Sequence, residues 1–124
     1  MTDKIETVVS NKIETGNQGE TLAARYLKEK GYEILARNYR HGKAEIDLIV
    51  QKDDWVLFVE VKTRKSSDYG EPEQFVMTQQ AGRIFDAAEE WIFSTNWQGH
   101  IRFDVVSVKP GESPEIEHFE DAIN

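Results

Sequence analysis

Apolar residues recur every three or four positions in two segments of the chain, the spacing of an amphipathic helix. The first is NQGETLAARYLKEKGY, residues 17–32, where Asn17 is placed to cap the helix and Gly31 to end it. The second is VMTQQAGRIFDAAEEWIF, residues 76–93, which follows a polar loop containing Gly70 and Pro72. The pattern therefore predicts two helices far apart in the chain.

Elsewhere the pattern changes to short runs of strand-forming residues separated by turns. Three such runs, expected to form an antiparallel meander, are EILARNYR (33–40), AEIDLIV (44–50) and WVLFVEVKTR (55–64). HIRFDVVSVKP (100–110) predicts a further strand, and PEIEHFE (114–120) a short last one. The order of helix, three strands, helix and strand favours a mixed α/β fold, with a central sheet flanked by helices.

Length and composition limit the class of protein. The 124 residues fit a single domain, expected over 16–124 after a polar leader at 1–15. There is no cysteine, so disulfides, thiolate metal sites and cysteine nucleophiles are excluded. The first residues lack the apolar core of a signal peptide, and no apolar run is long enough to span a bilayer. These features predict a soluble cytoplasmic protein with no membrane role.

The net charge of −8 argues against a general nucleic-acid binder, but the charge is unevenly distributed. Residues 25–65 contain ten Lys and Arg against seven acids, a balance of +3, so the remainder sums to −11. This permits a mildly basic face, although ordinary solvated surface produces differences of this size as well. The candidates for phosphate contacts are Arg37, Arg40, Lys43 and Arg64.

Charged residues interrupt the second and third strands at particular positions. Because side chains alternate along a strand, Glu60 and Lys62 share one face of the third strand. A two-residue KD turn or a four-residue QKDD turn would pair positions whose numbers sum to 105. That register places Asp47 opposite Phe58 and diagonal to Glu60, with Glu45 directly opposite Glu60. The strands are thus expected to gather acids and a lysine at one end of the sheet.

Acids that converge in this way repel one another unless a cation neutralises them. Oxygen ligands without a His or Cys cluster suit Mg²⁺ or Mn²⁺ better than zinc. A lysine beside them can orient water and stabilise charge on a phosphate, which is the chemistry of phosphodiester hydrolysis. The alternative is a surface ion pair between Glu60 and Lys62, with Asp47 as a solvated charge at the strand edge.

At this point the sequence resembles the YraN family of uncharacterised bacterial proteins. The similar segments cover residues from about Gly16 to His118 and include GNQGETLAARYLKEKGYEILARNYR, AEIDLIV, FVEVKTR and RFDVVSV. That family is grouped with the PD-(D/E)XK nuclease superfamily and is similar to Holliday junction resolvases and restriction endonucleases. The resemblance implies a restriction-endonuclease-like fold, DNA as the partner, Mg²⁺ or Mn²⁺ as the cofactor, and a homodimer.

The resemblance also assigns roles to residues of this chain. Asp47 matches the first acid of the superfamily motif, and Glu60 and Lys62 match its E-x-K pair. Glu20 matches an acid on a helix over the metal, and the backbone carbonyl of Val61 would be a further ligand. Such proteins commonly carry basic residues in the second helix, where Arg83 is the remaining cation.

Several alternatives stay open. Asn17 and Glu20 have the spacing of a capping box, which would make Glu20 structural. Trp55, Trp91 and Phe103 are expected in the core or at its edge rather than as base-stacking platforms. The leading hypothesis is a Mg²⁺-dependent nuclease acting on DNA. The others are a non-catalytic module that binds nucleic acid or a repair partner, and a structural or protein-interaction domain.

Overall fold

The structure is a computed structural model, and it describes residues 11–64 and 78–123; for 11–17 and 78–81 it describes the backbone only. In this part of the chain two helices and five strands follow one another. Their order and bounds are α2 (Asn11–Glu29), β1 (Glu33–His41), β2 (Ala44–Lys52), β3 (Trp55–Thr63), α3 (Thr78–Thr95), β4 (His100–Lys109) and β5 (Glu115–Phe119).

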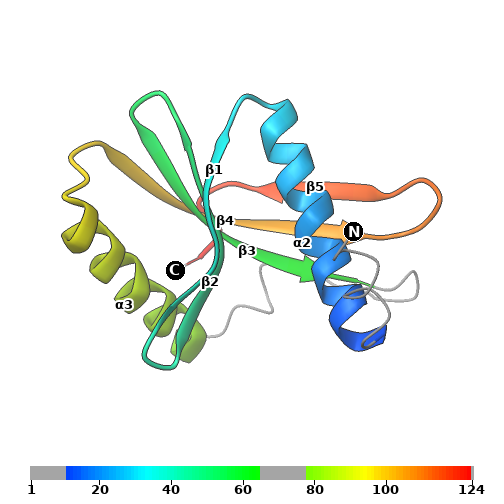
Figure 1. Cartoon of the computed structure of the whole chain (residues 1–124), viewed down its shortest axis with the longest axis horizontal. Helices are drawn as coiled ribbons and strands as arrows, with labels where there is room; N and C mark the ends of the chain where they lie inside the picture. Colours follow the sequence, from blue (N-terminus) through cyan, green and yellow to red (C-terminus); the bar gives the residue numbers. More distant parts are fainter. Residues whose placement is uncertain (1–10, 65–77, 124) are drawn as a thin grey trace, which may run out of the picture.

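The five strands form one sheet in the order β1-β2-β3-β4-β5 (Figure 1). Neighbouring strands are antiparallel except β3 and β4, which are parallel. A parallel pair needs a crossover connection, and α3 lies within it. The mixed α/β class and the antiparallel meander of the first three strands are therefore confirmed.

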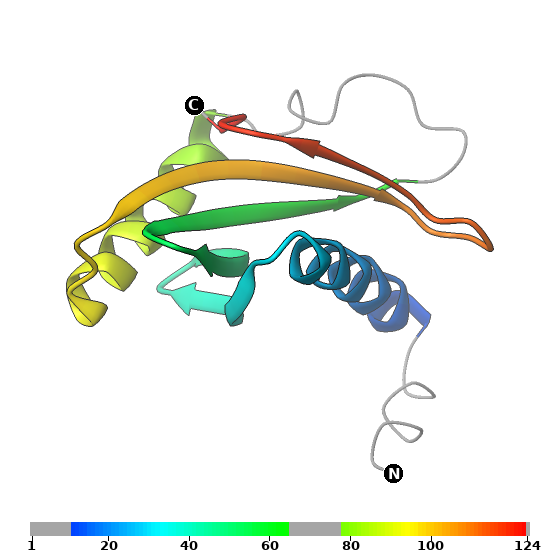
Figure 2. The ribbon, with the colours of Figure 1, turned by 90° about the horizontal axis from the view of Figure 1, so that it is seen from above.

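The two helices pack against opposite faces of β3. Alternate residues of β3, Leu57 and Val59, join a buried cluster with Ala23 and Leu27 of α2. The β3 residues that alternate with these, Val56 and Phe58, join a second buried cluster with α3. From α3 this cluster contains Ile84, Ala87, Ala88 and Trp91. Figure 2 shows both helices beside the sheet, with α2 covering only part of its length. The sheet is thus buried on both sides in its middle and less so at its ends.

The first helix begins earlier than the sequence pattern predicts. It starts at Asn11 rather than Asn17, so the predicted cap lies in the helix interior. The segment from 11 to 16 contains no proline, and a single Gly16 costs a helix only about 1 kcal/mol. The capping-box interpretation of Glu20 is therefore wrong. Of the predicted leader, residues 1–10 lie outside the described residues.

The register of the β2–β3 hairpin also differs from the prediction. Lys52 pairs with Trp55, and Ile49 rather than Asp47 lies opposite Phe58. Paired positions sum to 107, because the turn consists of Asp53 and Asp54, and Asp53 adopts a φ of 55°. Aspartate tolerates this left-handed conformation better than most residues, which favours the tight turn at this point.

Strands β2 and β3 separate before either strand ends. Their ladder stops at the pair Leu48 and Val59, whereas β2 continues beside β1 to Ala44 and β3 continues beside β4 to Thr63. Strict alternation along the second strand predicts that Ile46 and Leu48 share one face, but Ile46 packs in the α3-side cluster and Leu48 in the α2-side cluster. A strand that twists away from its neighbour breaks strict alternation in this way.

The three aromatic residues expected in the core have different outcomes. Trp91 is buried and Phe103 packs at the edge of the α3-side cluster, as predicted. Trp55 is 39% exposed, so its assignment to the core is wrong. It stands at the start of β3, where α2 no longer covers the sheet.

In residues 11–64 and 78–123, neither helix combines the length and apolar character needed to cross a bilayer.

Candidate functional site

Asp47 lies at the point where β2 and β3 part. Its Oδ2 accepts a hydrogen bond of 2.8 Å from the backbone amide of Val61. The β2–β3 ladder has already ended at Leu48 and Val59, so a side chain takes the place of the next strand partner. This contact fixes the carboxylate of Asp47 against the second half of β3.

Asp47 and Glu60 form a close pair of acids. The β2–β3 ladder ends one position before these two acids, so the predicted diagonal pairing of Asp47 with Glu60 and the direct pairing of Glu45 with Glu60 are both wrong. The pKa of Asp47 is raised to about 8, first by burial and then by the hydrogen bond and the charge of Glu60, while the amide of Val61 acts in the opposite direction. Glu60 itself is only 9% exposed. Two acids in so little water favour a shared proton or a bound cation.

Lys62 completes the E-x-K sequence on the same strand. Its Nζ lies 3.8 Å from Glu60 Oε2, and its side chain is 24% exposed. The ammonium group therefore reaches both the acid pair and the solvent. A group in this position can contact a phosphate or a water molecule that enters from outside.

Glu20 reaches the same region from α2. Its pKa is raised by burial first and by the charge of Asp47 second, which places the two acids near each other. Glu20 Oε1 is buried and makes no hydrogen bond in the described part of the chain. Arg37 Nη2 lies 3.6 Å from Glu20 Oε1, an ion pair without a hydrogen bond. A carboxylate oxygen has more than one lone pair, so this oxygen can accept a metal ion beside the guanidinium.

The close approach of α2 to β3 brings Glu20 into position. Gly19, the residue before it, is buried, and a side chain there would overlap Thr63 at the end of β3. Glycine allows the helix backbone to come this near without a shift of Thr63. Gly19 therefore sets the distance between Glu20 and the strand that carries Glu60 and Lys62.

The residues present fit a magnesium ion held by few protein ligands. Among residues 11–64 and 78–123, no set of three Asp, Glu, His or Cys side chains stands in metal-binding geometry. Magnesium is usually bound through one or two carboxylates together with waters and substrate phosphates. Asp47 and Glu60 supply such a pair, and the unbonded oxygen of Glu20 is a further donor. The predicted role of the Val61 carbonyl stays a prediction.

The predicted phosphate-binding cations do not form one patch. Arg37 pairs with Glu20, and Arg40 Nη2 lies 3.2 Å from Glu45 Oε2. Lys43 and Arg83 line one open cleft of about 670 Å³ between the β1–β2 turn and α3. The other charged residues that line this cleft are Asp86, Glu89 and Glu90.

Arg64 completes the predicted set of cations. It follows directly after β3, and its backbone amide donates a hydrogen bond of 2.8 Å to the carbonyl of Val108. The distribution therefore supports Arg37 as a cation at the acid site. Arg40, Lys43, Arg64 and Arg83 remain predictions.

One polar cluster was missed by the sequence analysis. Asp104 is fully buried in β4 and accepts hydrogen bonds of 2.9 Å each from Arg102 Nε and Nη2. His118 Nε2 lies 2.7 Å from Asp104 Oδ2. The sequence does contain an indication of this cluster: Asp104 interrupts the otherwise apolar strand segment RFDVVSV, and a buried carboxylate requires charged or hydrogen-bonding partners.

Comparison with known proteins gives a family. Residues 19–108 match the family described as Uncharacterised protein family UPF0102. A UPF0102 protein of Cytophaga hutchinsonii is 45% identical over 82% of this chain and 90% of its own length. One from Rhodococcus opacus is 44% identical over 92% of this chain and 99% of its own. The resemblance to an uncharacterised bacterial family is thus confirmed at that level: the chain belongs to the family UPF0102.

Proposed function

We propose that the protein is a Mg²⁺- or Mn²⁺-dependent endonuclease of the PD-(D/E)XK superfamily that acts on DNA. The observation that carries the proposal is the buried pair of Asp47 and Glu60, with Lys62 beside it, at the point where β2 and β3 separate. Branched DNA and repair intermediates are the substrates to test first, because the resemblance to resolvases favours them.

The arrangement of the fold supports this proposal. The sequence Glu60-Val61-Lys62 ends a central strand, and the other acid stands on the adjacent antiparallel strand, as the superfamily motif requires. A helix covers each face of the sheet, and α2 carries the third acid, Glu20. The restriction-endonuclease-like fold is part of the proposal.

Each residue has a distinct task in the proposed reaction. Asp47 and Glu60 would hold the divalent cation, which would supply positive charge to the scissile phosphate. The Val61 amide keeps Asp47 oriented by occupying one of its oxygens. Lys62, 3.8 Å from Glu60, donates hydrogen bonds to the attacking water and to the phosphate oxygens, where negative charge develops. Glu20 provides a further oxygen from the helix.

The direct test is a cleavage assay with metal and variant controls. Linear, flapped and four-way DNA are incubated with purified protein in Mg²⁺, Mn²⁺ or EDTA. Asp47→Asn, Glu60→Gln and Lys62→Ala should each reduce cleavage at least about 100-fold, a typical loss when a charge-stabilising group is removed. Asp53→Asn and Lys109→Ala change the same residue types outside the site and should leave the cleavage rate unchanged. Cleavage that survives the three site substitutions unchanged would refute the assignment.

A second candidate is a module that binds nucleic acid or a repair partner without cleaving. It is favoured by the absence, in the described part of the chain, of a set of three side chains in metal-binding geometry. In that case DNA binding should weaken steeply with salt, as phosphate contacts require, and no cleavage should appear in any metal. Binding that is detected only together with turnover would exclude this candidate.

A further inference from the structure

The starts of β3 and β4 carry an exposed stack of planar side chains. Trp55 is paired with His100 in the parallel register, and their rings stack with centroids 4.7 Å apart at an angle of 25°. The guanidinium carbon of Arg102 lies 5.8 Å from the centre of the Trp55 ring. Trp55 is 39% exposed and the His100 side chain 62%, and the exposed Asp54 lies with its Oδ2 3.5 Å from His100 Nε2. Stacked rings exposed among polar groups form a candidate binding surface.

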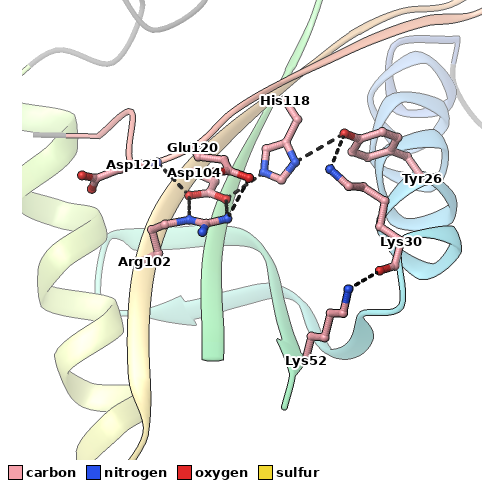
Figure 3. Close-up of polar contacts among 8 residues, drawn as sticks. All are labelled: Tyr26, Lys30, Lys52, Arg102, Asp104, His118, Glu120 and Asp121. Atoms are coloured by element: carbon pink, nitrogen blue, oxygen red, sulfur yellow. Dashed lines mark hydrogen bonds and ion pairs between the residues drawn. The ribbon is translucent and has the colours of Figure 1, made fainter. Parts of the chain in front are cut away.

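Two lysines lie beside a tyrosine each, and one of them, Lys52, borders this stack. Lys52, which pairs with Trp55 across the hairpin, lies with its Nζ 5.6 Å from the centre of the Tyr32 ring and donates a hydrogen bond of 2.9 Å to the Lys30 carbonyl. Lys30 Nζ donates one of 3.1 Å to the hydroxyl of Tyr26 (Figure 3). Within 11–64 and 78–123, neither ammonium is ion-paired with a carboxylate. The pKa of Lys30 is raised by its hydrogen bond to Tyr26 and by the charge of Glu120, so Lys52 carries the charge that is more available to an anion.

The cluster around Asp104 makes this surface rigid. Asp104 holds the Arg102 guanidinium through two hydrogen bonds and is itself held by His118 and by the backbone amide of Asp121 (Figure 3). Glu120 lies 3.5 Å from Arg102 as well, so the charge of Arg102 is already balanced. Arg102 thus supports the Trp55 ring from one side and adds little attraction for phosphate.

We propose that this surface, defined by Lys30, Lys52, Trp55 and His100, binds a single-stranded DNA segment. Bases stack on the Trp55 and His100 rings, and the two lysines contact neighbouring phosphates. Single strands fit this chemistry because their bases are free to stack on aromatic side chains, whereas the bases of a duplex are already stacked. The proposal deepens the proposed nuclease function by naming a substrate class.

The surface and the acid site lie on the same strand, at different positions along it. Trp55 begins β3 and Glu60 lies five residues further along the same strand, about 17 Å away at 3.3 Å per residue. Side chains alternate along a strand, so Trp55 shares the face of Leu57 and Val59, whereas Glu60 shares that of Val56 and Phe58. The surface is therefore a separate contact for the substrate, on the other side of β3 from Glu60. We expect DNA with a single-stranded arm to bind more tightly than blunt duplex.

The test is binding of a fluorescent single-stranded oligonucleotide in EDTA and low salt, followed by anisotropy. Trp55→Ala and His100→Ala should each weaken binding, the first by about tenfold or more. The double variant Lys30→Ala with Lys52→Ala should reduce the slope of log affinity against log salt by about 1.4, since each phosphate contact contributes about 0.7 for single strands. Lys109→Ala, at the far end of β4, should change neither quantity.

Several outcomes would overturn the proposal. One is wild-type affinity in Trp55→Ala and in the double lysine variant, and another is equal affinity for blunt duplex and single strand. Tighter binding of RNA of the same sequence would overturn the assignment to DNA. If Trp55→Ala does not fold, as judged by circular dichroism, the exposed His100→Ala and the salt slope decide the matter. Because the assay contains EDTA, its result is independent of cleavage, so failure of this proposal and failure of the nuclease proposal can be told apart.

Discussion

The backbone amide of Val61 donates a hydrogen bond of 2.8 Å to Oδ2 of Asp47, across the gap where β2 and β3 have ceased to pair. A buried amide without a hydrogen-bond partner is costly. The Asp47 carboxylate accepts the hydrogen bond of the Val61 amide in place of a backbone carbonyl of β2. The same contact holds Asp47 beside Glu60. The fold therefore keeps two acids together at a point where their repulsion opposes stability.

Asp47→Asn should stabilise the metal-free protein at alkaline pH. The pKa of Asp47 is raised to about 8, above the unfolded value of about 3.9. Its favourable contribution is therefore fully present below about pH 4 and is lost as the pH rises through about 8. Asparagine keeps an oxygen for the Val61 amide but carries no charge. At pH 9 in EDTA we expect a gain of about 1 kcal/mol or more, or roughly 3–5 °C in Tm.

Thermal unfolding at intervals from pH 5 to pH 9 measures this effect. The difference in Tm between the variant and the wild type should grow as the pH rises. Asp53→Asn in the β2–β3 turn serves as the control and should show no such trend. A variant that is no more stable than the wild type at pH 9 would contradict the repulsion between the acids.

Magnesium should stabilise the wild-type protein, and Glu60→Gln should abolish most of that effect. A ligand that binds only the folded state at ten times its dissociation constant contributes about 1.4 kcal/mol. Removing one carboxylate of the pair removes a ligand with full negative charge. Titration of Mg²⁺ by calorimetry and by Tm in parallel tests this, with EDTA reversing the shift. Equal stabilisation of Glu60→Gln and wild type would place the ion elsewhere.

The sequence predicted the meeting of Asp47 and Glu60 although it assigned the wrong register. The predicted and observed pairings differ by two in the sum of positions, and side chains alternate with a period of two. An error of two residues therefore keeps every side chain on its face and shifts only which residue lies opposite. A turn of odd length would have separated the two acids.

Other features could not be obtained from the pattern of residues. The choice of turn depended on Asp53 adopting a positive φ, which several alternative turns would not require. The exposure of Trp55 depends on how far α2 extends over the sheet, a property of packing rather than of local sequence. The partners of Asp104 come from β4, from β5 and from the segment after β5, so only the folded chain brings them together.

Asp104→Asn should destabilise the protein at neutral pH. Burial alone would raise the pKa of Asp104, but hydrogen bonds from His118, Arg102 and the Asp121 amide outweigh it, and the pKa is lowered. A lowered pKa means that the stabilisation is present above the unfolded value of about 3.9 and is lost as the pH falls below it. We expect a loss of about 2 kcal/mol or more at pH 7, since the partners of a buried charge are left without it.

Urea unfolding of the wild type and Asp104→Asn at pH 7 and at pH 3 measures this difference. The gap in free energy of unfolding should narrow at pH 3, because the Asp104 carboxylate of the unfolded wild-type chain binds a proton below about pH 3.9 and this favours unfolding. Glu120→Gln, which removes the exposed partner of Arg102, should cost much less at both values. A constant gap across this range would show that Asp104 acts through shape rather than charge.

Gly19→Ala should disturb both stability and the acid site, and a second substitution should correct it. An alanine methyl group at Gly19 would overlap Thr63 Oγ1, so α2 must move away from β3 or Thr63 must shift. Overpacking of this kind typically costs about 1–3 kcal/mol. Since Glu20 follows Gly19, the same movement should weaken Mg²⁺ binding.

Thr63→Ala removes the oxygen that the methyl group meets, so the double variant should recover most of the lost stability and Mg²⁺ affinity. Urea unfolding and Mg²⁺ calorimetry of the two single variants and the double variant measure this coupling, and strictly additive costs would mean that Gly19 and Thr63 do not restrain each other.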